Sequence, residues 1–384
     1  MTTPFYLTLK EIWRNRGRFL LFSLVIALIT LLVLFIAALA DGLGNGNREY
    51  IEKLNGELIV YKSNVDLSIG ASRLDRSQLR QILRVPGVKD AGQVSFSSVV
   101  LVLGEGKKFN VALIGVEPGK PGEPPVLSGS GLEDRRGNEA IIDRNVALRT
   151  GYTVGDQLRL KAIQGTQEEF YDLRIVGVSD GRQYSLQPAV IVSHPTFDRV
   201  KPGTPVVNAT DLVSNLIIVQ LDESTNWKAM ATVLASQVEG IQAVDRQTAY
   251  QNTPGYSAQQ STLDTQRFFS LLIGVLVIGG FFQIQTLQKV PQIGMLKAIG
   301  APNWLIAVAA VTQIILVTIL GVGIGALATV LLSFTFPATV PIVFSPMAIV
   351  IGIASLMLIG PIGGLVSVRY ALRVEPLTAL GLTG

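Results

Sequence analysis

The stretch that decides the fold is Phe19–Leu39, which reads FLLFSLVIALITLLVLFIAAL. It contains no charged residue, and as a helix its 21 residues would extend about 31 Å, close to the thickness of the hydrocarbon core of a bilayer. The whole sequence agrees, because 48% of its 384 residues are hydrophobic, only 16% are charged, and the mean hydropathy is +0.43. We therefore predict a membrane protein.

A cleavable signal peptide is the alternative interpretation of this stretch. Basic residues precede the apolar run, and Ala38-Leu39-Ala40 resembles a cleavage site. The run is longer than the roughly 7–15 residues of a signal-peptide core, so a retained membrane anchor is the simpler interpretation.

Three more spans are predicted downstream. Residues 268–288 are uncharged, although glutamines make the last turns polar. Between residues 298 and 368 there is no charged residue and no histidine, which is enough length for two spans separated by a proline-marked turn. The predicted order is a cytoplasmic amphipathic segment 1–18, span 19–40, an extracytoplasmic domain 41–267, span 268–288, a cytoplasmic coupling helix 289–303, span 304–332, an extracytoplasmic turn 333–346, span 347–368 and a cytoplasmic tail 369–384.

The basic residues that flank the spans predict the orientation. With Glu11 and Glu375, the eight on one side give that side a net charge of +6, while the rest of the chain, nearly all of it in the large loop, has a net charge of −2. This is the positive-inside pattern, so we expect both termini in the cytoplasm of a cell (inner) membrane and the large loop outside. Because these basic residues are few and lie only at the ends of the spans, they also argue against a nucleic-acid partner. The eight residues are Lys10, Arg14, Arg16, Arg18, Lys289, Lys297, Arg369 and Arg373.

The large loop is predicted to be an α+β domain inserted between the first and second spans. Two of its helices are each followed by a glycine turn, which suggests two related βαβ-like units around a β-rich insertion. The Pro/Gly-rich stretch Glu117–Gly137 is the expected loop or subdomain boundary. The expected strands are Glu57–Tyr61, Ser98–Leu103, Asn110–Val116, Leu158–Ala162, Leu173–Val178, Ala189–Val192 and Leu216–Leu221. The expected helices are Ser77–Leu83, Asp143–Thr150 and Thr225–Val238.

Several kinds of chemistry are not supported. There is no cysteine and a single histidine, His194, so no zinc or redox cluster is expected. No G-x-x-x-x-G-K-[ST] loop occurs to bind ATP. His194 is interpreted as a surface or strand-end residue rather than the base of a triad with Ser193 or Asp198, and Glu168-Glu169 as a solvated loop. We predict no catalytic, cofactor-binding or metal-binding residue.

Two glycine pairs inside the predicted spans have small-xxx-small spacing. Gly321 and Gly325 form one pair and Gly360 and Gly364 form the other. This spacing lets helix backbones approach closely in lipid, so we expect helix packing at both pairs; local flexibility is the alternative.

The connection between the second and third spans predicts a short amphipathic helix. Pro291 suits a first helical turn, and Gly300 with Pro302 supplies a stop. Such a helix could dock into a cytoplasmic partner through Ile293, Leu296 and Gly300, or it could be an interfacial turn that touches only lipid.

Gln292–Ala301, QIGMLKAIGA, closely resembles the E-I-G-x-L-[RK]-A-[IL]-G-A segment that follows the second span in permease subunits of MacB/FtsX/LolC-type (type VII) ABC transporters. Gln292 stands where that family usually has Glu. Similarity extends to the N-terminal TLKEIWRNRGR, to VPGVKDAGQV and EAIIDRNVALRTGYTVGDQLRL in the loop, and to the tail ALRVEPLTALG.

The resemblance implies a mechanotransmission permease that exports or extracts a substrate. ATP and Mg²⁺ would be held by a separate ABC ATPase subunit, and a second permease copy, identical or a paralogue, would complete the membrane part, together with an adaptor and an outer-membrane channel in some members. The ATPase-coupling residues would be Gln292, Ile293, Gly294, Met295, Leu296, Lys297, Ala298, Ile299, Gly300 and Ala301. Two alternatives are an FtsX-like regulator of extracytoplasmic enzymes and a membrane-anchored sensor or enzyme without an ATPase.

Overall fold

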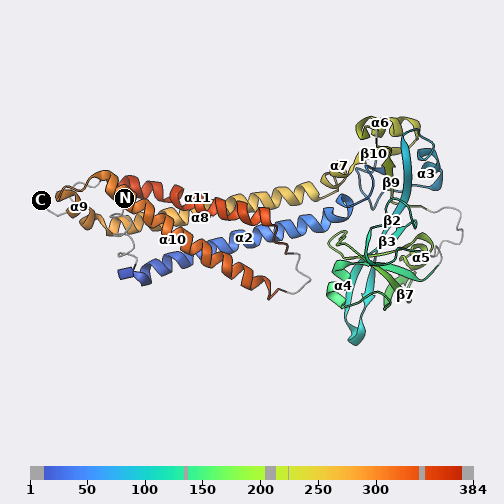
Figure 1. Ribbon diagram of the computed structural model, residues 1–384, viewed down its shortest axis with the longest axis horizontal. Coiled ribbons are helices and arrows are strands. Elements are labelled where there is room, and N and C mark those ends of the chain that lie inside the picture. The colour runs from blue at the N-terminus through green and yellow to red at the C-terminus, as the bar shows by residue number, and fades with distance from the viewer. Residues whose placement is uncertain (1–12, 134–136, 204–212, 224, 337–341, 374–384) are drawn as a thin grey trace. The chain divides into compact units, whose positions relative to one another are not determined.

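A computed structural model describes residues 13–133, 137–203, 213–223, 225–336 and 342–373. It contains two compact units, a helical unit (Met1–Gly42 with Gln260–Gly384) and a strand-rich domain (Leu43–Gln259) (Figure 1). The expected segments 1–18, 333–346 and 369–384 lie partly outside the described residues.

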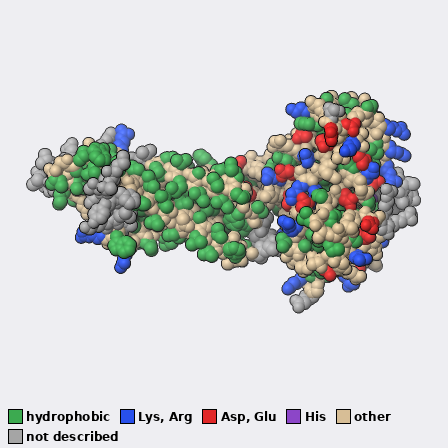
Figure 2. Space-filling model, in the orientation of Figure 1, with side chains coloured by type: hydrophobic (Ala, Val, Ile, Leu, Met, Phe, Trp, Pro, Cys, Tyr) green, Lys and Arg blue, Asp and Glu red, His purple; other side chains and the backbone are tan. Residues whose placement is uncertain are grey.

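The helical unit is built from long apolar helices. Among the described residues, three helices are long and apolar enough to cross a membrane, within Arg16–Gly46, Tyr256–Gln288 and Asn303–Ser333; a fourth helix has a shorter apolar window, Ile349–Gly364. Figure 2 shows apolar side chains over much of the visible surface of these helices and charged side chains gathered over the domain. The helices are α2 (Arg16–Glu52), α8 (Tyr256–Gln288), α9 (Val290–Ala298), α10 (Asn303–Ser333) and α11 (Pro346–Arg373).

Two of these helices are longer than the spans predicted from the sequence. α2 continues twelve residues beyond the expected end at residue 40, and α8 begins twelve residues before the expected start at residue 268. The additions are polar, and an apolar window detects only the part of a helix that lipid can cover. The domain therefore begins and ends on helices rather than on loops.

Close backbone contacts at glycines join the helices of this unit. A Cβ atom added at Gly321 would lie 2.5 Å from Cβ of Ile26, and one at Gly325 would lie 2.5 Å from the carbonyl oxygen of Ala27, both on α2. Gly360 and Gly364 of α11 lie against the side chains of Thr318 and Ile314 on α10. The structure thus places both glycine pairs at helix–helix contacts, where lipid offers no hydrophobic driving force and close packing takes its place.

Two more contacts close the set of helices. Gly279 of α8 lies against Gly363 of α11, where an added Cβ would be 2.8 Å from the Gly363 carbonyl oxygen. The rings of Phe22 on α2 and Phe281 on α8 meet edge to face with their centroids 4.7 Å apart. Each of the four long helices therefore contacts at least two others.

The domain has one mixed sheet of ten strands within the described residues, in the order β10-β1-β9-β2-β3-β8-β5-β7-β4, with β6 pairing β2 and β7. The strands are β1 (Leu58–Lys62), β2 (Val88–Val102), β3 (Lys108–Val116), β4 (Val126–Gly129), β5 (Glu139–Asp143), β6 (Gln157–Gln164), β7 (Gln167–Ser179), β8 (Ala189–Ser193), β9 (Leu216–Leu221) and β10 (Ile241–Asp245). The helices are α3 (Arg76–Ile82), α4 (Arg144–Thr150), α5 (His194–Val200), α6 (Trp227–Gln237) and α7 (Arg246–Gln251), with a 3₁₀ turn at Gly104–Gly106.

The two expected βαβ-like units are present and interleave. β1-α3-β2 and β9-α6-β10 place their strands in the order β10-β1-β9-β2, all antiparallel, which is a split β-α-β arrangement. α3 and α6 share one core, to which Ile82 and Leu234 contribute. The insertion between β2 and β9 forms a second lobe with its own core, in which β3 pairs parallel to β8 and β5 parallel to β7.

The strand predictions were incomplete. All seven expected strands exist, but Ser98–Leu103 is only the end of the 15-residue β2, whose Gly and Ser residues weaken the apolar signal. β4, β5 and β10 and the short helices α5 and α7 were missed, and β4 lies inside the expected loop Glu117–Gly137. These elements have four to seven residues, so long-range pairing and packing rather than local pattern stabilise them.

The glycine contacts predict opposite effects for two neighbouring substitutions in α10. Gly323→Ala adds a methyl group in open space and should stabilise the protein by up to about 1 kcal/mol through helix propensity. Gly325→Ala forces the same methyl against the α2 backbone and should destabilise it by about 1–3 kcal/mol. Thermal unfolding of the purified full chain in detergent measures both, and equal stabilisation by the two would show that α2 does not pack there.

Candidate functional site

The α9 connection, residues 289–303, links two apolar helices through one short helix. Only Lys289 separates α8 from α9, and Pro291 lies in the first turn, where its missing N–H costs no hydrogen bond. The chain leaves α9 at Gly300, whose φ of +91° is one that side-chain-bearing residues rarely adopt. The short helix and its glycine stop therefore occur as expected, with bounds narrower than 289–303.

The side chains of α9 divide into two faces. Ile293 is 8% exposed and packs with Ile306 of α10, and Gly294 is buried as well. Met295, Leu296 and Ile299 are 59%, 42% and 78% exposed. These three exposed apolar side chains on one short connection form a surface that we call the α9 apolar face.

The exposed residues of α9 differ from those that the sequence predicted to face a partner. Ile293 was expected to point toward a partner together with Leu296 and Gly300. Instead it packs against Ile306 of α10, and the next residue, Gly294, is buried as well. Met295 and Ile299 take its place on the outside. The Lys297 ammonium donates to the Leu372 carbonyl oxygen at 2.8 Å, which ties the end of α9 to α11. The remaining predicted coupling residues lie in or directly after α9.

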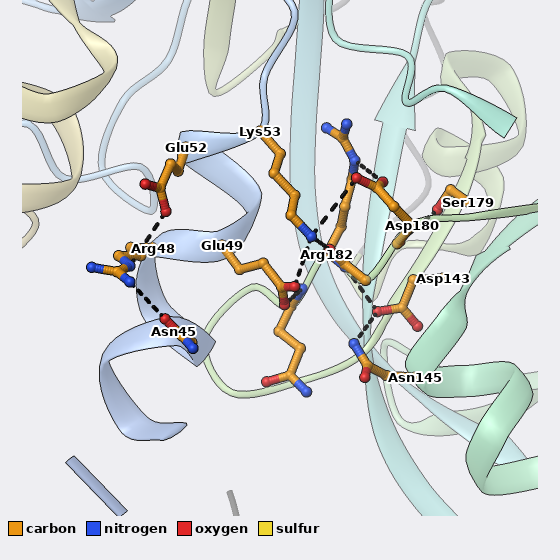
Figure 3. A network of polar contacts seen from close by, with 12 residues as sticks. Asn45, Arg48, Glu49, Glu52, Lys53, Asp143, Asn145, Ser179, Asp180 and Arg182 are labelled. Carbon is orange, nitrogen blue, oxygen red and sulfur yellow. Dashed lines mark hydrogen bonds and ion pairs between the residues drawn. The ribbon is translucent and has the colours of Figure 1, made fainter. Parts of the chain in front are cut away.

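The C-terminal end of α2 is held in the domain by a polar network that was not predicted from the sequence (Figure 3). We call Glu49, Lys53, Asp180, Arg182 and Gln183 the α2 clamp. The Lys53 ammonium is 2.9 Å from Glu49 and 3.7 Å from Asp180, and it donates to the Gly181 carbonyl oxygen. The Gln183 N–H donates to Glu49 Oε2 at 3.1 Å, and Arg182 pairs with Asp180 at 2.7 Å.

Backbone and apolar contacts reinforce the clamp. The Tyr50 N–H donates to the Gln183 carbonyl oxygen at 3.2 Å, and the Leu186 N–H donates to the Gly46 carbonyl oxygen at 3.1 Å. Tyr50, Ile51 and Leu54 are buried in the core of the domain. The only signal in the sequence was the i,i+4 spacing of Glu49 and Lys53, which is common on helices and does not identify a partner.

Asp143 lies directly behind the clamp. It caps α4 by accepting from the Val146 N–H at 2.7 Å, and its other oxygen accepts from Asn145 Nδ2 at 3.0 Å and from the Arg182 N–H at 3.3 Å. Burial raises the pKa of Asp143 to about 6, because desolvation of the carboxylate outweighs these hydrogen bonds.

The other titratable candidates have structural roles. His194 directly follows β8, so the strand-end interpretation was confirmed, but it is buried, with Nε2 3.0 Å from the Gln93 carbonyl oxygen, so the surface interpretation was wrong. Burial lowers the pKa of His194. Asp198 pairs with Lys201 at 2.6 Å, away from a triad. Glu168 and Glu169 lie in β7, not in a loop, where Glu168 pairs with Lys161. Among the described residues, no group of three or more His, Cys, Asp or Glu could hold a metal ion.

The raised pKa of Asp143 predicts a pH dependence of stability. Between about pH 4 and 6 the unfolded carboxyl ionises while the folded one keeps its proton, so the contribution of Asp143 to stability falls as pH rises through this window. Asp143→Asn keeps an acceptor for Val146 but cannot titrate. Its stability relative to the parent should therefore rise across the window by up to roughly 3 kcal/mol, since one pKa unit is about 1.4 kcal/mol.

Asp75→Asn is the matched control. Asp75 caps α3, and its hydrogen bonds from Ser77 and Gln78 lower its pKa, so its contribution to stability is lost as pH falls. The Asn variant should therefore become less stable relative to the parent as pH rises, the opposite sign. The change for Asp75→Asn falls at lower pH than that for Asp143→Asn, at and below the ordinary aspartate pKa of 3.8. Thermal unfolding of both variants from about pH 3 to pH 7 covers both ranges, and a pH-independent difference for Asp143→Asn would contradict the raised pKa.

Comparison with known proteins follows the division into domain and helices. A model described as the MacB-like periplasmic core domain matches residues 19–237, and one described as the FtsX-like permease C-terminal matches residues 267–376. A protein named as the hemin transport system permease HrtB of Staphylococcus haemolyticus is 26% identical over 372 residues, 97% of this chain and 98% of that protein. An uncharacterized ABC transporter permease of Mycobacterium bovis is 22% identical over 378 residues, 96% of this chain and 97% of that protein.

Among solved structures, the periplasmic region of MacB from Actinobacillus actinomycetemcomitans matches with a TM-score of 0.38 and 14% identity, covering 53% of this chain and 95% of that one. The family models carry the assignment, because the first covers more than half of the chain and the second covers α9 and the last two long helices. The chain therefore belongs to the MacB/FtsX/LolC-type (type VII) permeases of ABC transporters.

Proposed function

We propose that this chain is the membrane subunit of a mechanotransmission ABC transporter and couples ATP hydrolysis by a separate ATPase subunit to movement of an extracytoplasmic domain. The observation that carries the proposal is the α9 apolar face. An exposed row of Met295, Leu296 and Ile299 on a short helix between two spans is suited to enter an apolar groove of a partner protein. ATP and Mg²⁺ would bind to that partner.

The α2 clamp supplies the second half of the proposed coupling. α2 is one helix from Arg16 to Glu52, and its last turns are fastened to the loop after β7 by ion pairs and backbone hydrogen bonds. Displacement of the membrane part of α2 would therefore pull on that loop and on the Asp143 cap of α4 behind it. In this proposal α2 is the element that carries the motion from the membrane part to the domain.

The membrane arrangement that fits the proposal has four spans, α2, α8, α10 and α11, with α9 and both termini cytoplasmic. The basic flanks of the spans support this orientation. A second permease copy, identical or a paralogue, would complete the spans, and a periplasmic adaptor with an outer-membrane channel would extend the path where an outer membrane exists.

Hemin is the first substrate to test, because the Staphylococcus relatives are named for hemin transport. Substrate-dependent stimulation of the assembled ATPase would support hemin or a molecule of similar chemistry. A flat response would assign the transporter a different substrate without affecting the coupling proposal.

The α9 apolar face predicts which substitutions uncouple the ATPase. Leu296→Asp and Ile299→Asp place a carboxylate where the partner groove would bury it, so ATPase co-purification should fall about tenfold or more while the permease still folds and reaches the membrane. Ile293→Asp should instead lower the yield of folded permease, because Ile293 packs against Ile306.

Asn303→Asp is the control for these variants. It adds the same charge to the same connection, at the exposed first residue of α10, where a helix N-terminus favours an anion. Co-purification should be unchanged. If Leu296→Asp and Ile299→Asp bound the ATPase as well as Asn303→Asp does, α9 would be only an interfacial turn.

The proposed orientation predicts where single cysteines react. The sequence has none of its own, so Ser130→Cys, Thr232→Cys and Asn303→Cys each provide one exposed thiol. A membrane-impermeant maleimide applied to intact cells should label the first two and should label Asn303→Cys only after lysis. Labelling of Asn303→Cys in intact cells would invert the assignment of α9 to the cytoplasm.

A further inference from the structure

A cavity of about 140 Å³ lies behind α9, between α9 and the facing ends of α8 and α10. One water molecule needs roughly 10–15 Å³ by the same kind of measure, so the space admits a group much larger than one water. All of the residues that line the cavity belong to the helical unit. Leu296 is the one lining residue that is also part of the α9 apolar face.

Two buried amide groups on the cavity wall have no hydrogen-bond partner within the described residues. The side chains of Gln285 on α8 and Gln313 on α10 are 4% and 7% exposed, and Nε2 of each is unpartnered. An unpartnered buried donor costs about 1–3 kcal/mol, so two at one cavity indicate that an acceptor belongs there.

A positive charge lies beside these donors. The Lys289 ammonium donates to Gln313 Oε1 at 2.7 Å, which turns the Gln313 amide nitrogen away from the lysine, and none of the residues that line the cavity is acidic. An ammonium beside two amide donors is suited to an anionic, acceptor-rich group, of which a phosphate is the common example.

Apart from Thr286 and Gln292, the rest of the wall is apolar, and it lies beside the end of α8. Phe282, Leu305, Ile306 and Ile314 line the cavity beside the polar groups, and Lys289 follows the last residue of α8. A ligand that satisfies both parts has an anionic head and a hydrocarbon body. Basic pockets between spans on the cytoplasmic side are suited to the headgroups of anionic lipids.

We propose that this cavity binds the phosphate headgroup of an anionic phospholipid, with Lys289, Gln285 and Gln313 as its donors and its acyl chains along α8 and α10. The lipid would lie against the inner side of α9, where Ile293 and Leu296 also border the cavity. The choice of the cytoplasmic leaflet rests on the proposed function, but binding itself does not.

Binding is tested on the permease without its ATPase, so its result is independent of the coupling proposal. The full chain is purified in nanodiscs of phosphatidylcholine alone and of an equimolar mixture with phosphatidylglycerol. Because a ligand stabilises the folded state, the thermal midpoint should rise in the mixture. Phosphatidylglycerol should also be retained over phosphatidylcholine after transfer to detergent, as measured by mass spectrometry.

Two variants and two controls place the effect on the cavity. Lys289→Gln and Gln313→Leu should each reduce retained phosphatidylglycerol about fivefold, the equivalent of roughly 1 kcal/mol for the loss of one contact, and should reduce the thermal shift. Lys297→Gln removes the same charge from the other end of α9, and Gln283→Leu makes the same change at an exposed position of α8. Neither residue lines the cavity, so both controls should retain as much phosphatidylglycerol as the parent and show the same rise of the thermal midpoint in the mixture.

The thermal midpoint in phosphatidylcholine alone shows whether each variant folds. Should Lys289→Gln or Gln313→Leu unfold there, Gln285→Leu provides the same test with an apolar replacement of similar size. Equal retention of phosphatidylglycerol by parent and cavity variants would overturn the proposal. So would full competition by soluble glycerol phosphate, which would make the ligand a free phosphate compound instead of a lipid.

Discussion

Close approach of neighbouring helices at glycines is the constraint on which the helical unit depends. In a bilayer, an apolar side chain gains no hydrophobic free energy when it moves from lipid to the surface of another helix. Helix association therefore depends on the van der Waals contacts that close approach provides. Gly321 and Gly325 bring α10 against α2, Gly360 and Gly364 bring α11 against α10, and Gly279 meets Gly363. These contacts position the ends of α8 and α10, and those ends in turn determine where α9 lies and how the cavity behind it is shaped.

α9 shows how one short helix can serve two surfaces. Its inner side, with Ile293, completes the packing against α10 and closes the cavity, while Met295 and Ile299 remain outside. A partner that pressed on the outer side would also press on whatever occupies the inner side. The proposed ATPase contact and the proposed lipid site would therefore be coupled mechanically, since an element packed on both sides cannot move without disturbing both.

The domain carries the other attachment. Its split β-α-β lobe packs α3 and α6 on one side of the sheet, while the last turns of α2 contribute Tyr50, Ile51 and Leu54 to the core that includes Ile114. The α2 clamp adds ion pairs that are only partly exposed, including that of the buried Arg182 with Asp180. The last turns of α2 are therefore held in the domain both by buried apolar side chains and by partly buried charged groups.

The sequence by itself determined the membrane class, the presence of long apolar helices beside a large α/β domain, and the α9 connection with its Gly300 stop, because hydropathy and turn chemistry are local properties of the chain. Most strands of the domain were also predictable, since runs such as Leu216–Leu221 are strongly apolar. Only the tertiary structure decided what depends on distant partners. Glu49 and Gln183 are 134 residues apart in the sequence, yet they share a hydrogen bond. Gln285 and Gln313 lie on different helices but line the same cavity. Ile293 is buried because it packs against Ile306 of another helix. The residue pattern along one helix or strand does not specify which other element covers it, because that depends on how the whole chain packs.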